Sequence, residues 1–257
     1  MFDVLQDIAG RVVWVTGAGT GIGRAVAVAF AEAGCRVAIT GRRAAPLEET
    51  AALMASPPLI VPADVADADA VSAAHARVVA ELGPVQVLVN NAGINVPRRH
   101  WKDLQPGDMA SLVDVNLKGP FLCSLAVLPA MRAAGGGVLV HVVSNAATGI
   151  YAVAGPAYTA SKHGARAMSA TLNAEEGIHG IRSVCINPGE VETPILDLRP
   201  APTSAEDRAL MVQPEDIAAA ALFAARMPAR TCLAEMLITP TDNNFHRATA
   251  RRLAGEA

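Results

Sequence analysis

Short runs of β-branched and aliphatic residues alternate along the chain with longer, alanine-rich segments of helical character. The runs predict strands at 12–16, 36–40, 59–63, 86–89, 138–143, 181–187 and 235–239. The segments between them predict helices near 22–33, 45–55, 67–82, 107–132, 157–178 and 214–226. Strands that alternate with helices favour βα units and a parallel sheet. Because a run such as VLVHVV is apolar almost throughout, we expect helices to cover both faces of that sheet.

The composition favours one domain with a large core. Hydrophobic residues make up 52% of the 257 residues and charged residues 18%, which is typical of a globular chain. No repeat or low-complexity stretch divides the sequence, so we expect a single α/β domain over 1–257 with a doubly wound parallel sheet of about seven strands. The proline-rich segment 194–213 is the one long irregular connection, and it predicts a lid over a binding site.

Charge and cysteine content exclude several classes of partner. The net charge of −3 gives no general attraction to nucleic acid or to an anionic membrane surface. The cysteines are scattered and form no C-x-x-C pair, which argues against a disulfide framework and against a zinc site. We therefore expect no bound metal. These cysteines are Cys35, Cys123, Cys185 and Cys232.

The N-terminal residues give no sign of export. Asp3 and Asp7 stand where a signal peptide would carry basic residues, which favours a cytoplasmic protein. The span between Arg132 and Lys162 lacks charged residues, but glycines and Pro156 interrupt it. We therefore interpret this span as a buried strand and a loop, not as a membrane helix.

A glycine-rich turn follows the first predicted strand and precedes a helix. The stretch VVWVTGAGTGIG carries Gly17, Gly19, Gly21 and Gly23. Glycines let the backbone turn tightly, and they let a pyrophosphate approach the helix N-terminus, where free N–H groups favour negative charge. The spacing departs from the generic Gly-x-Gly-x-x-Gly pattern. A tight structural turn therefore remains the alternative to a dinucleotide site.

Six further motifs follow this turn in a specific order. They are ADV at 63–65, NNAG at 90–93, VNLKG at 115–119, Ser144 after a central strand, YTASK at 158–162 and NPGEVET at 187–193. In this order and approximate spacing the chain resembles the short-chain dehydrogenase/reductase family from about Arg11 to Thr239. The resemblance implies a Rossmann-type fold and transfer of a hydride between a nicotinamide cofactor and a carbonyl or secondary alcohol.

The resemblance also implies a catalytic set. Tyr158 would be the general acid or base, Lys162 would hold the nicotinamide ribose, Asn116 would support a water-linked proton relay, and Ser144 would bind the substrate carbonyl. From the residues alone, Lys162 at position i+4 shares a helix face with Tyr158. We therefore expect its positive charge to lower the pKa of the phenol.

One spacing leaves the serine position open. Fourteen positions separate Ser144 from Tyr158, where the family usually has thirteen, so counting back from the tyrosine gives Asn145. Counting forward from the strand gives Ser144, at the carboxyl end where ligands bind in such sheets. We favour Ser144, with an extra residue in the loop that follows.

The remaining family contacts predict a cofactor groove, with one structural alternative. For Asn90, the alternative to cofactor binding is that its side chain simply caps the end of its strand. The residues that the resemblance assigns to the cofactor are Gly17, Gly19, Thr20, Gly21, Ile22, Gly23, Asp64, Val65, Asn90, Ala92, Gly93, Tyr158, Lys162, Pro188, Gly189, Val191 and Thr193.

The residues after the second strand predict a preference for NADP(H). An NAD-preferring relative usually places an acid at the position of Gly41, where it would repel a 2′-phosphate. Arg42 and Arg43 follow instead, and a guanidinium donates paired hydrogen bonds to phosphate. NAD(H) stays open, because Thr20 stands where NADP-specific relatives often carry a basic residue.

Two other functions and several other residue roles are alternatives to this prediction. A non-catalytic NAD(P)(H)-binding or redox-sensing protein is the rival from another class, and a dehydratase or epimerase has less support. His141 is interpreted as a core residue, and His163 lacks the pattern of a triad member. Arg98 or Arg99 is a candidate for a substrate carboxylate, although exposed arginines are usually solvated.

We expect the substrate to be a small carbonyl or alcohol compound. The resemblance implies a homo-oligomer, either a dimer or a tetramer, assembled through the helices near 107–132 and 157–178.

Overall fold

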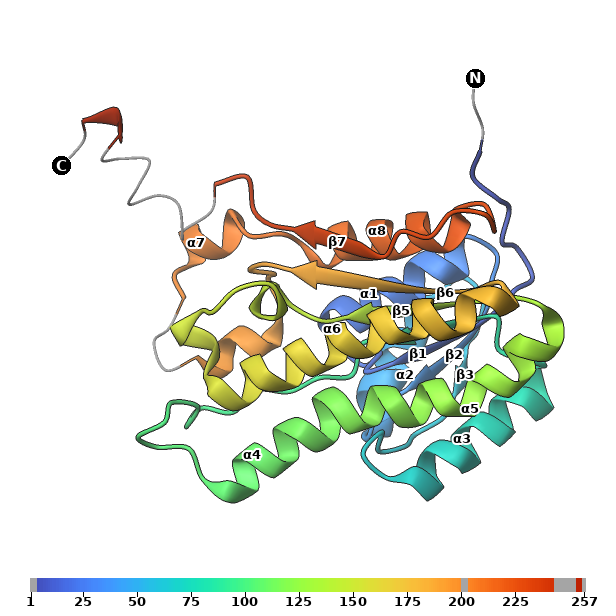
Figure 1. Cartoon of the computed structure of the whole chain (residues 1–257), viewed down its shortest axis with the longest axis horizontal. Helices are drawn as coiled ribbons and strands as arrows, with labels where there is room; N and C mark the ends of the chain where they lie inside the picture. The colour runs from blue at the N-terminus through green and yellow to red at the C-terminus, as the bar shows by residue number, and fades with distance from the viewer. Residues whose placement is uncertain (1–3, 200–202, 243–252, 256–257) are drawn as a thin grey trace.

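A seven-stranded parallel sheet forms the centre of the molecule (Figure 1). The computed structural model describes residues 4–199, 203–242 and 253–255. The strand order is β3-β2-β1-β4-β5-β6-β7, and every neighbouring pair is parallel. The strands are β1 Val12–Thr16, β2 Arg36–Thr40, β3 Leu59–Ile60, β4 Val87–Asn90, β5 Gly137–Val142, β6 Ile181–Pro188 and β7 Glu235–Ile238. The predicted doubly wound α/β fold is confirmed.

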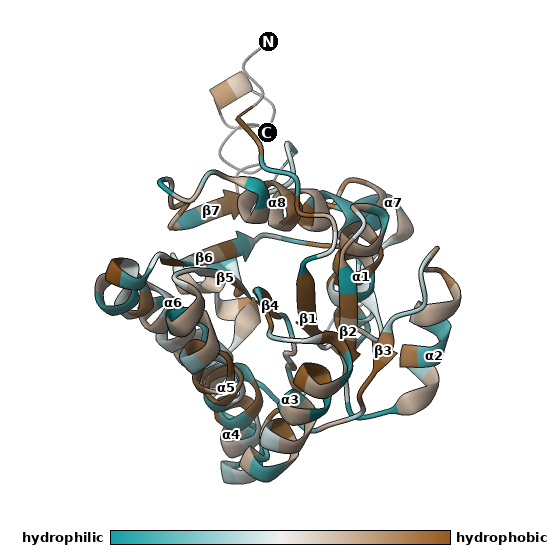
Figure 2. Ribbon diagram, turned by 90° about the vertical axis from the view of Figure 1, so that its right-hand side faces the viewer, coloured by the Kyte–Doolittle hydropathy of each residue, from teal (hydrophilic) through white to brown (hydrophobic). Residues whose placement is uncertain are grey.

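Alternating side chains of the strands enter two separate cores. Val13 and Val15 of β1 pack into the core on one face, whereas Val12 and Trp14 pack into the core on the other. Both faces of the sheet are therefore buried, which explains why the strand sequences are almost continuously apolar. Figure 2 shows the apolar strands enclosed between helices on both sides.

Eight α-helices flank the sheet within the described part of the chain. They are α1 Gly21–Glu32, α2 Ala44–Ala52, α3 Ala68–Leu82, α4 Pro106–Val113, α5 Gly119–Ala134, α6 Pro156–Glu176, α7 Ala205–Ala209 and α8 Pro214–Arg226. The cores place α1, α2 and α8 on one face and α3 and α5 on the other. Local sequence sets several ends: Asp67 caps α3 by accepting hydrogen bonds from two backbone N–H groups, and Pro156 opens α6.

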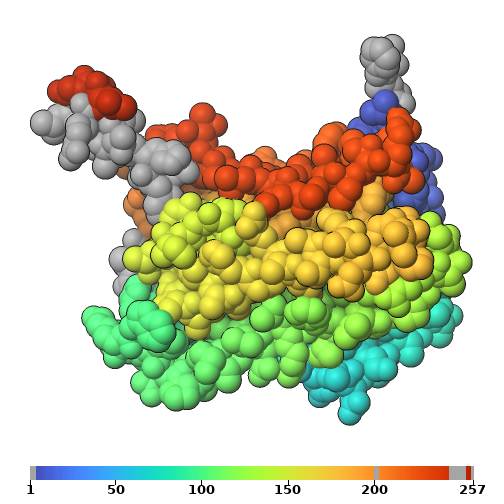
Figure 3. Space-filling view, viewed as in Figure 1, coloured from blue at the N-terminus to red at the C-terminus, as the bar shows by residue number. Residues whose placement is uncertain are grey.

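The helix expected over 107–132 is interrupted. A π-helix, η1 Asp114–Lys118, joins α4 to α5, and such turns appear mostly where a site requires an irregular helix. This long helix, Pro106–Ala134, is apolar enough to cross a membrane by length and composition. It is a core helix, because it packs against α3 and α6. Figure 3 shows α6 lying alongside it on one face of the molecule.

Two other boundaries differ from the sequence predictions. The strand expected over 59–63 ends after Ile60. The segment 194–213 is not irregular throughout, because it contains the 3-10 helix η5 Pro194–Leu198 and α7. Local sequence explains both helices: Pro194 opens η5, and the Ser204 hydroxyl accepts from the Asp207 N–H at 3.0 Å to cap α7.

Candidate active site

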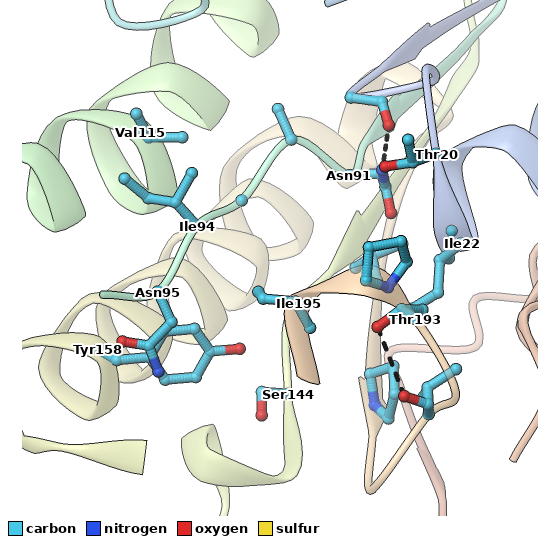
Figure 4. Close-up of a pocket in the computed structure, with 18 of the residues that line it drawn as sticks. Thr20, Ile22, Asn91, Ile94, Asn95, Val115, Ser144, Tyr158, Thr193 and Ile195 are labelled. Carbon is cyan, nitrogen blue, oxygen red and sulfur yellow. Dashed lines mark hydrogen bonds between the residues drawn. The ribbon is translucent and has the colours of Figure 1, made fainter. Parts of the chain in front are cut away.

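A cavity opens at the carboxyl ends of the strands, where β1 neighbours both β2 and β4. This is the point at which the strand order reverses, and open α/β sheets bind ligands there. The cavity runs from the glycine turn after β1 to the start of α6, which carries Tyr158. Figure 4 shows side chains from several of these loops around the same space.

The glycine turn needs its glycines. Gly17 has φ +64°, and a Cβ there would lie 2.6 Å from the Cα of Ala92. Gly21 has φ +53°, and a Cβ at Gly19 would lie 2.9 Å from the Cβ of Pro46. Side chains at these positions would fill or strain the cradle. Thr20, the N-cap of α1, makes no side-chain cap, so N–H groups of the first turn stay free for an anion.

Asn91 is a residue of the site that the sequence analysis missed. Its backbone N–H donates to Thr16 Oγ1 at 3.1 Å, and its side-chain amide donates to the carbonyl oxygens of Thr16 and Gly17, both at 3.1 Å. Asn91 also lines the cavity. The sequence signal that could have identified this residue is its place as the second asparagine of the NNAG motif.

Asn90 and Gly23 have supporting positions outside the cavity. Asn90 is buried, and its amide lies 3.2 Å from both Ser124 Oγ and His141 Nδ1. Asn90 does not line the cavity, which favours the alternative role at the strand end. A Cβ at Gly23 would lie 2.2 Å from the carbonyl oxygen of Gly17. This glycine therefore lets α1 pack beneath the turn.

The other residues expected at the cofactor do surround the cavity. Asp64 accepts from the Ala66 N–H at 2.9 Å, which orders the loop after β3. Arg42 and Arg43 are exposed at the rim. In the described ranges, neither arginine makes an ion pair. The further lining residues from the predicted set are Ile22, Val65, Ala92, Gly93, Pro188, Gly189, Val191 and Thr193.

Ser144, Tyr158 and Lys162 meet at the other end of the cavity. Tyr158 and Lys162 project from α6, and Ser144 follows β5; Figure 4 shows Tyr158 and Ser144. The Lys162 Nζ lies 5.6 Å from the centre of the Tyr158 ring and donates to the Val142 carbonyl oxygen at 3.4 Å. Thus the loop after β5 and helix α6 bring together three of the residues that the sequence placed in the catalytic set.

Burial dominates the acid–base properties of this cluster. Burial raises the pKa of Tyr158, while a hydrogen bond with Ser144 and the charge of Arg99 partly offset it. Burial lowers the pKa of Lys162 to about 8. The expected lowering of the phenol pKa by Lys162 was wrong for this arrangement, because desolvation of the phenolate is the larger effect.

Asn116 lies at the centre of the π-helix and binds the loop after β4. Its Oδ1 accepts from the Ile94 N–H at 2.8 Å, and its Nδ2 donates to the Ile94 carbonyl oxygen at 3.0 Å. A Cβ at Gly93 would lie 3.4 Å from both Asn116 Oδ1 and Lys162 Nζ. Asn116 and Lys162 therefore flank the same small residue.

The structure distinguishes Ser144 from Asn145 by their contacts. Ser144 Oγ accepts from the Ala146 N–H at 3.1 Å and makes the hydrogen bond with Tyr158. Asn145 begins a short 3-10 helix, and its Oδ1 accepts from Ser144 Oγ at 3.2 Å. Both residues line the cavity, but of the two only Ser144 makes a hydrogen bond with the Tyr158 side chain.

The cavity also includes residues that no motif identified. Arg99 lines it, whereas its neighbour Arg98 is exposed and pairs with Asp108 at 3.2 Å. The other residues at this end of the cavity come from the segments after β4, β5 and β6, and no motif assigned them a role. They are Ile94, Asn95, Tyr151, Val153, Glu190, Ile195, Leu196 and Arg199.

Neither His141 nor His163 lies in the cavity. His141 is buried on β5, and burial lowers its pKa to about 4. His163 is exposed, and its Nδ1 lies 2.9 Å from the Thr159 carbonyl oxygen. In the described part of the chain, no group of three or more His, Cys, Asp or Glu side chains is placed to hold a metal ion.

The family is established by comparison with known proteins. The short chain dehydrogenase family model matches residues 11–202. The chain belongs to this family, and it is a dehydrogenase/reductase that acts on alcohol or carbonyl compounds.

Two curated relatives show the range of that similarity. D-threitol dehydrogenase of Mycolicibacterium smegmatis is 40% identical over 195 residues, which cover 75% of this chain and 74% of the relative. Glycine betaine reductase ATRR of Emericella nidulans is 34% identical over 246 residues, which cover 91% of this chain. The match spans only 19% of that longer protein.

Solved structures with bound cofactors have the same fold. The closed form of serine dehydrogenase complexed with NADP+ has a TM-score of 0.84 at 27% identity, covering 91% of this chain and 96% of that one. The 3-ketoacyl-(acyl-carrier-protein) reductase of Brucella melitensis complexed with NADH has a TM-score of 0.82 at 28% identity, covering 90% and 98%. Structural neighbours thus bind either nicotinamide cofactor.

Proposed function

We propose that this protein transfers a hydride between NADP(H) and a small carbonyl or secondary alcohol, with Tyr158 as general acid or base. One observation carries the proposal: a single cavity joins the glycine turn to the cluster of Ser144, Tyr158 and Lys162. The first part suits a dinucleotide, and the second suits proton transfer to an oxygen atom.

The glycine turn fits the pyrophosphate of such a cofactor. The cradle is one that a Cβ at Gly17 or Gly19 would fill, and the N-terminus of α1 lacks a side-chain cap. Asp64 and Val65 would contact the adenine, and Lys162 would bind the nicotinamide ribose. Val191 and Thr193 would line the opposite wall of the cofactor cavity. When bound, the nicotinamide supplies or accepts the hydride.

Tyr158 would move the proton that accompanies the reaction. Because burial raises its pKa, the phenol is neutral at pH 7 and is ready to donate in carbonyl reduction. Ser144 would donate a hydrogen bond to the substrate oxygen, where negative charge develops. Asn116 would support a relay from Lys162 to water. Its amide, however, is already engaged with the Ile94 backbone, so it positions this loop as well.

The preference for NADP(H) rests on the rim after β2. Arg42 and Arg43 are exposed there without an acidic partner in the described ranges, and Gly41 offers no carboxylate to repel a 2′-phosphate. NAD(H) is the alternative, and the similar structure of the Brucella melitensis reductase complexed with NADH supports it. The proposed lid, 194–213, contributes Ile195, Leu196 and Arg199 to the cavity.

Assembly and location are further proposals. Phe121 and Leu125 of α5 are 44% and 61% exposed, and an apolar helix face supports a homo-oligomer, a dimer or a tetramer. The cysteines of the described part are all unpaired, which supports a reducing, cytoplasmic location.

The test is to follow absorbance of NADPH and NADH with a panel of ketones, keto acids, alcohols and hydroxy acids. The Tyr158→Phe variant serves as the control, because it keeps the ring and removes only the transferable proton. We expect turnover that falls by roughly 10³-fold or more in the variant, with cofactor binding retained. Cofactor binding without turnover of any compound would favour the non-catalytic rival.

A further inference from the structure

Arg99 is a buried cation beside the catalytic cluster. The residue is 5% exposed and lines the cavity. Over the described ranges, no carboxylate lies within ion-pair distance of its guanidinium, unlike Arg98, which pairs with Asp108. A buried charge without a partner is costly, and burial accordingly lowers the pKa of Arg99.

Two backbone carbonyls fix the orientation of this guanidinium. Nε donates to the Val96 carbonyl oxygen at 2.7 Å, and Nη2 donates to the Leu198 carbonyl oxygen. The first lies in the loop after β4 and the second at the end of η5. These bonds use one edge of the planar group. N–H groups on Nη1 and Nη2 remain, and they form the pair that a carboxylate accepts in parallel.

The charges around Arg99 leave the substrate end of the cavity positive. Arg199 is close enough for its charge to disfavour the charged form of Arg99. Glu190 also lines the cavity, but it pairs with Arg199 at 3.0 Å. This pair is close to neutral, so Arg99 keeps its charge uncompensated. Its electrostatic interaction with Tyr158 places it near the reacting end.

We propose that Arg99 binds a carboxylate of the substrate, so that the compounds turned over are keto acids and the matching hydroxy acids. The proposal rests on the proposed function and names the substrate class for the same cavity. The fixed fork of Arg99 favours a planar carboxylate, while the hydrogen bonds to Val96 and Leu198 keep it in place before the substrate arrives.

A purely structural Arg99 is the competing explanation. In that case its bonds to Val96 and Leu198 would only tie η5 to the loop after β4. Substrates that differ in charge alone separate these roles. Losing a structural tie would slow acid and neutral substrates equally, whereas losing a carboxylate partner would slow the acid selectively.

The test compares keto acids with their methyl esters. We would measure kcat/KM with NADPH for 3-oxobutanoate, 4-oxopentanoate and 4-acetylbenzoate and for the three esters. For the best pair, wild type should favour the acid by roughly 10²-fold. Arg99→Met should remove that preference, mainly through the acid, while Arg98→Met, the matched control, should keep it. If Arg99→Met does not fold, Arg99→Lys should lower the preference by about tenfold, because it keeps the charge and loses the fork.

Two results would overturn the proposal: esters that react as well as the acids in all three pairs, or an equal loss for acid and ester in Arg99→Met. If no carbonyl compound reacts at all, the proposed function fails, and calorimetric titration of the NADP+-saturated protein decides the anion site separately. Benzoate should then bind more tightly than benzamide in wild type and not in Arg99→Met. Equal binding would overturn the site, and tighter binding of phenyl phosphate would overturn its assignment to a carboxylate.

Discussion

The side-chain amide of Asn91 donates a hydrogen bond to the Gly17 carbonyl oxygen at 3.1 Å. This bond joins the end of β4 to the turn after β1, and it lies where the strand order reverses. A second bond from the same amide reaches the Thr16 carbonyl oxygen. The glycine turn is therefore held by a neighbouring strand as well as by its own backbone.

Replacing Asn91 should weaken cofactor binding. Asn91→Ala removes both side-chain bonds to the turn, so we expect the Kd for NADPH to rise by about tenfold or more. The Asn90→Ala variant is the matched control, because it removes an amide buried beside His141 and Ser124 but outside the cavity. It should lower the unfolding midpoint and change the Kd much less. Fluorescence titration with NADPH and thermal unfolding measure the two effects, and equal Kd values in both variants would contradict this account.

Ser144 and Asn145 should respond differently to truncation. Ser144→Ala removes the hydroxyl that contacts Tyr158 and should lower kcat by roughly 10²-fold, as loss of an oxyanion donor does. Asn145→Ala should have a much smaller effect, because its Oδ1 only accepts from Ser144. Steady-state kinetics on both variants decide the matter. The opposite ranking would place Asn145 at the catalytic position.

The buried charge of Lys162 should cost stability in a defined pH range. Its pKa of about 8 lies below the 10.5 of an ordinary lysine, so the unfolded chain binds more protons between these values. Stability therefore rises with pH across that window. Lys162→Met lacks this titration and should be more stable than wild type near pH 7, by on the order of 3 kcal/mol. The difference should shrink toward pH 10.5. Urea unfolding of both proteins at several pH values measures it, and a constant difference would show that Lys162 does not titrate in this way.

Cofactor choice should depend on Arg42. Arg42→Asp removes a partner for the 2′-phosphate and supplies an acceptor for the ribose hydroxyls of NAD(H). We expect wild type to have the higher kcat/KM with NADPH and the variant to shift toward NADH by about tenfold or more. The Arg24→Asp variant is not a suitable control, because Arg24 donates to the Gly19 carbonyl oxygen. Arg98→Asp is suitable, since that residue lies away from the rim. A wild type that prefers NADH would contradict the prediction.

The fold was predictable because its strongest signals are local. Each predicted strand exists, since apolar runs of β-branched residues favour strands covered on both faces. Errors occur where neighbouring residues compete for one position. Asn90 and Asn91 have the same chemistry, and only the point at which β4 ends decides which one faces the cavity. The interruption at Asp114–Lys118 leaves the apolar pattern nearly unchanged, so periodicity did not reveal it.

The site was only partly predictable from the sequence. Motif order predicted that Tyr158 and Lys162 belong to one site, and both line the cavity. The direction of the pKa shift at Tyr158, however, depends on how deeply the fold buries the ring. Arg98 and Arg99 are adjacent in the sequence, and nothing local distinguishes the solvent-exposed one from the buried one. Their difference arises from contacts with η5, about a hundred residues further along the chain.

In the π-helix between α4 and α5, the position of Asn116 in the site depends on an irregularity that a regular α-helix would not have. Each residue turns an α-helix by about 100°, so deleting one residue from Asp114–Lys118 would restore an even helix and rotate Asn116 away from the Ile94 backbone. Such a shortened protein would gain a more regular helix and lose the bonds that shape the loop beside Gly93 and Lys162. The extra residue thus makes the helix irregular, and the same residue is required to hold Asn116 against the loop of the site.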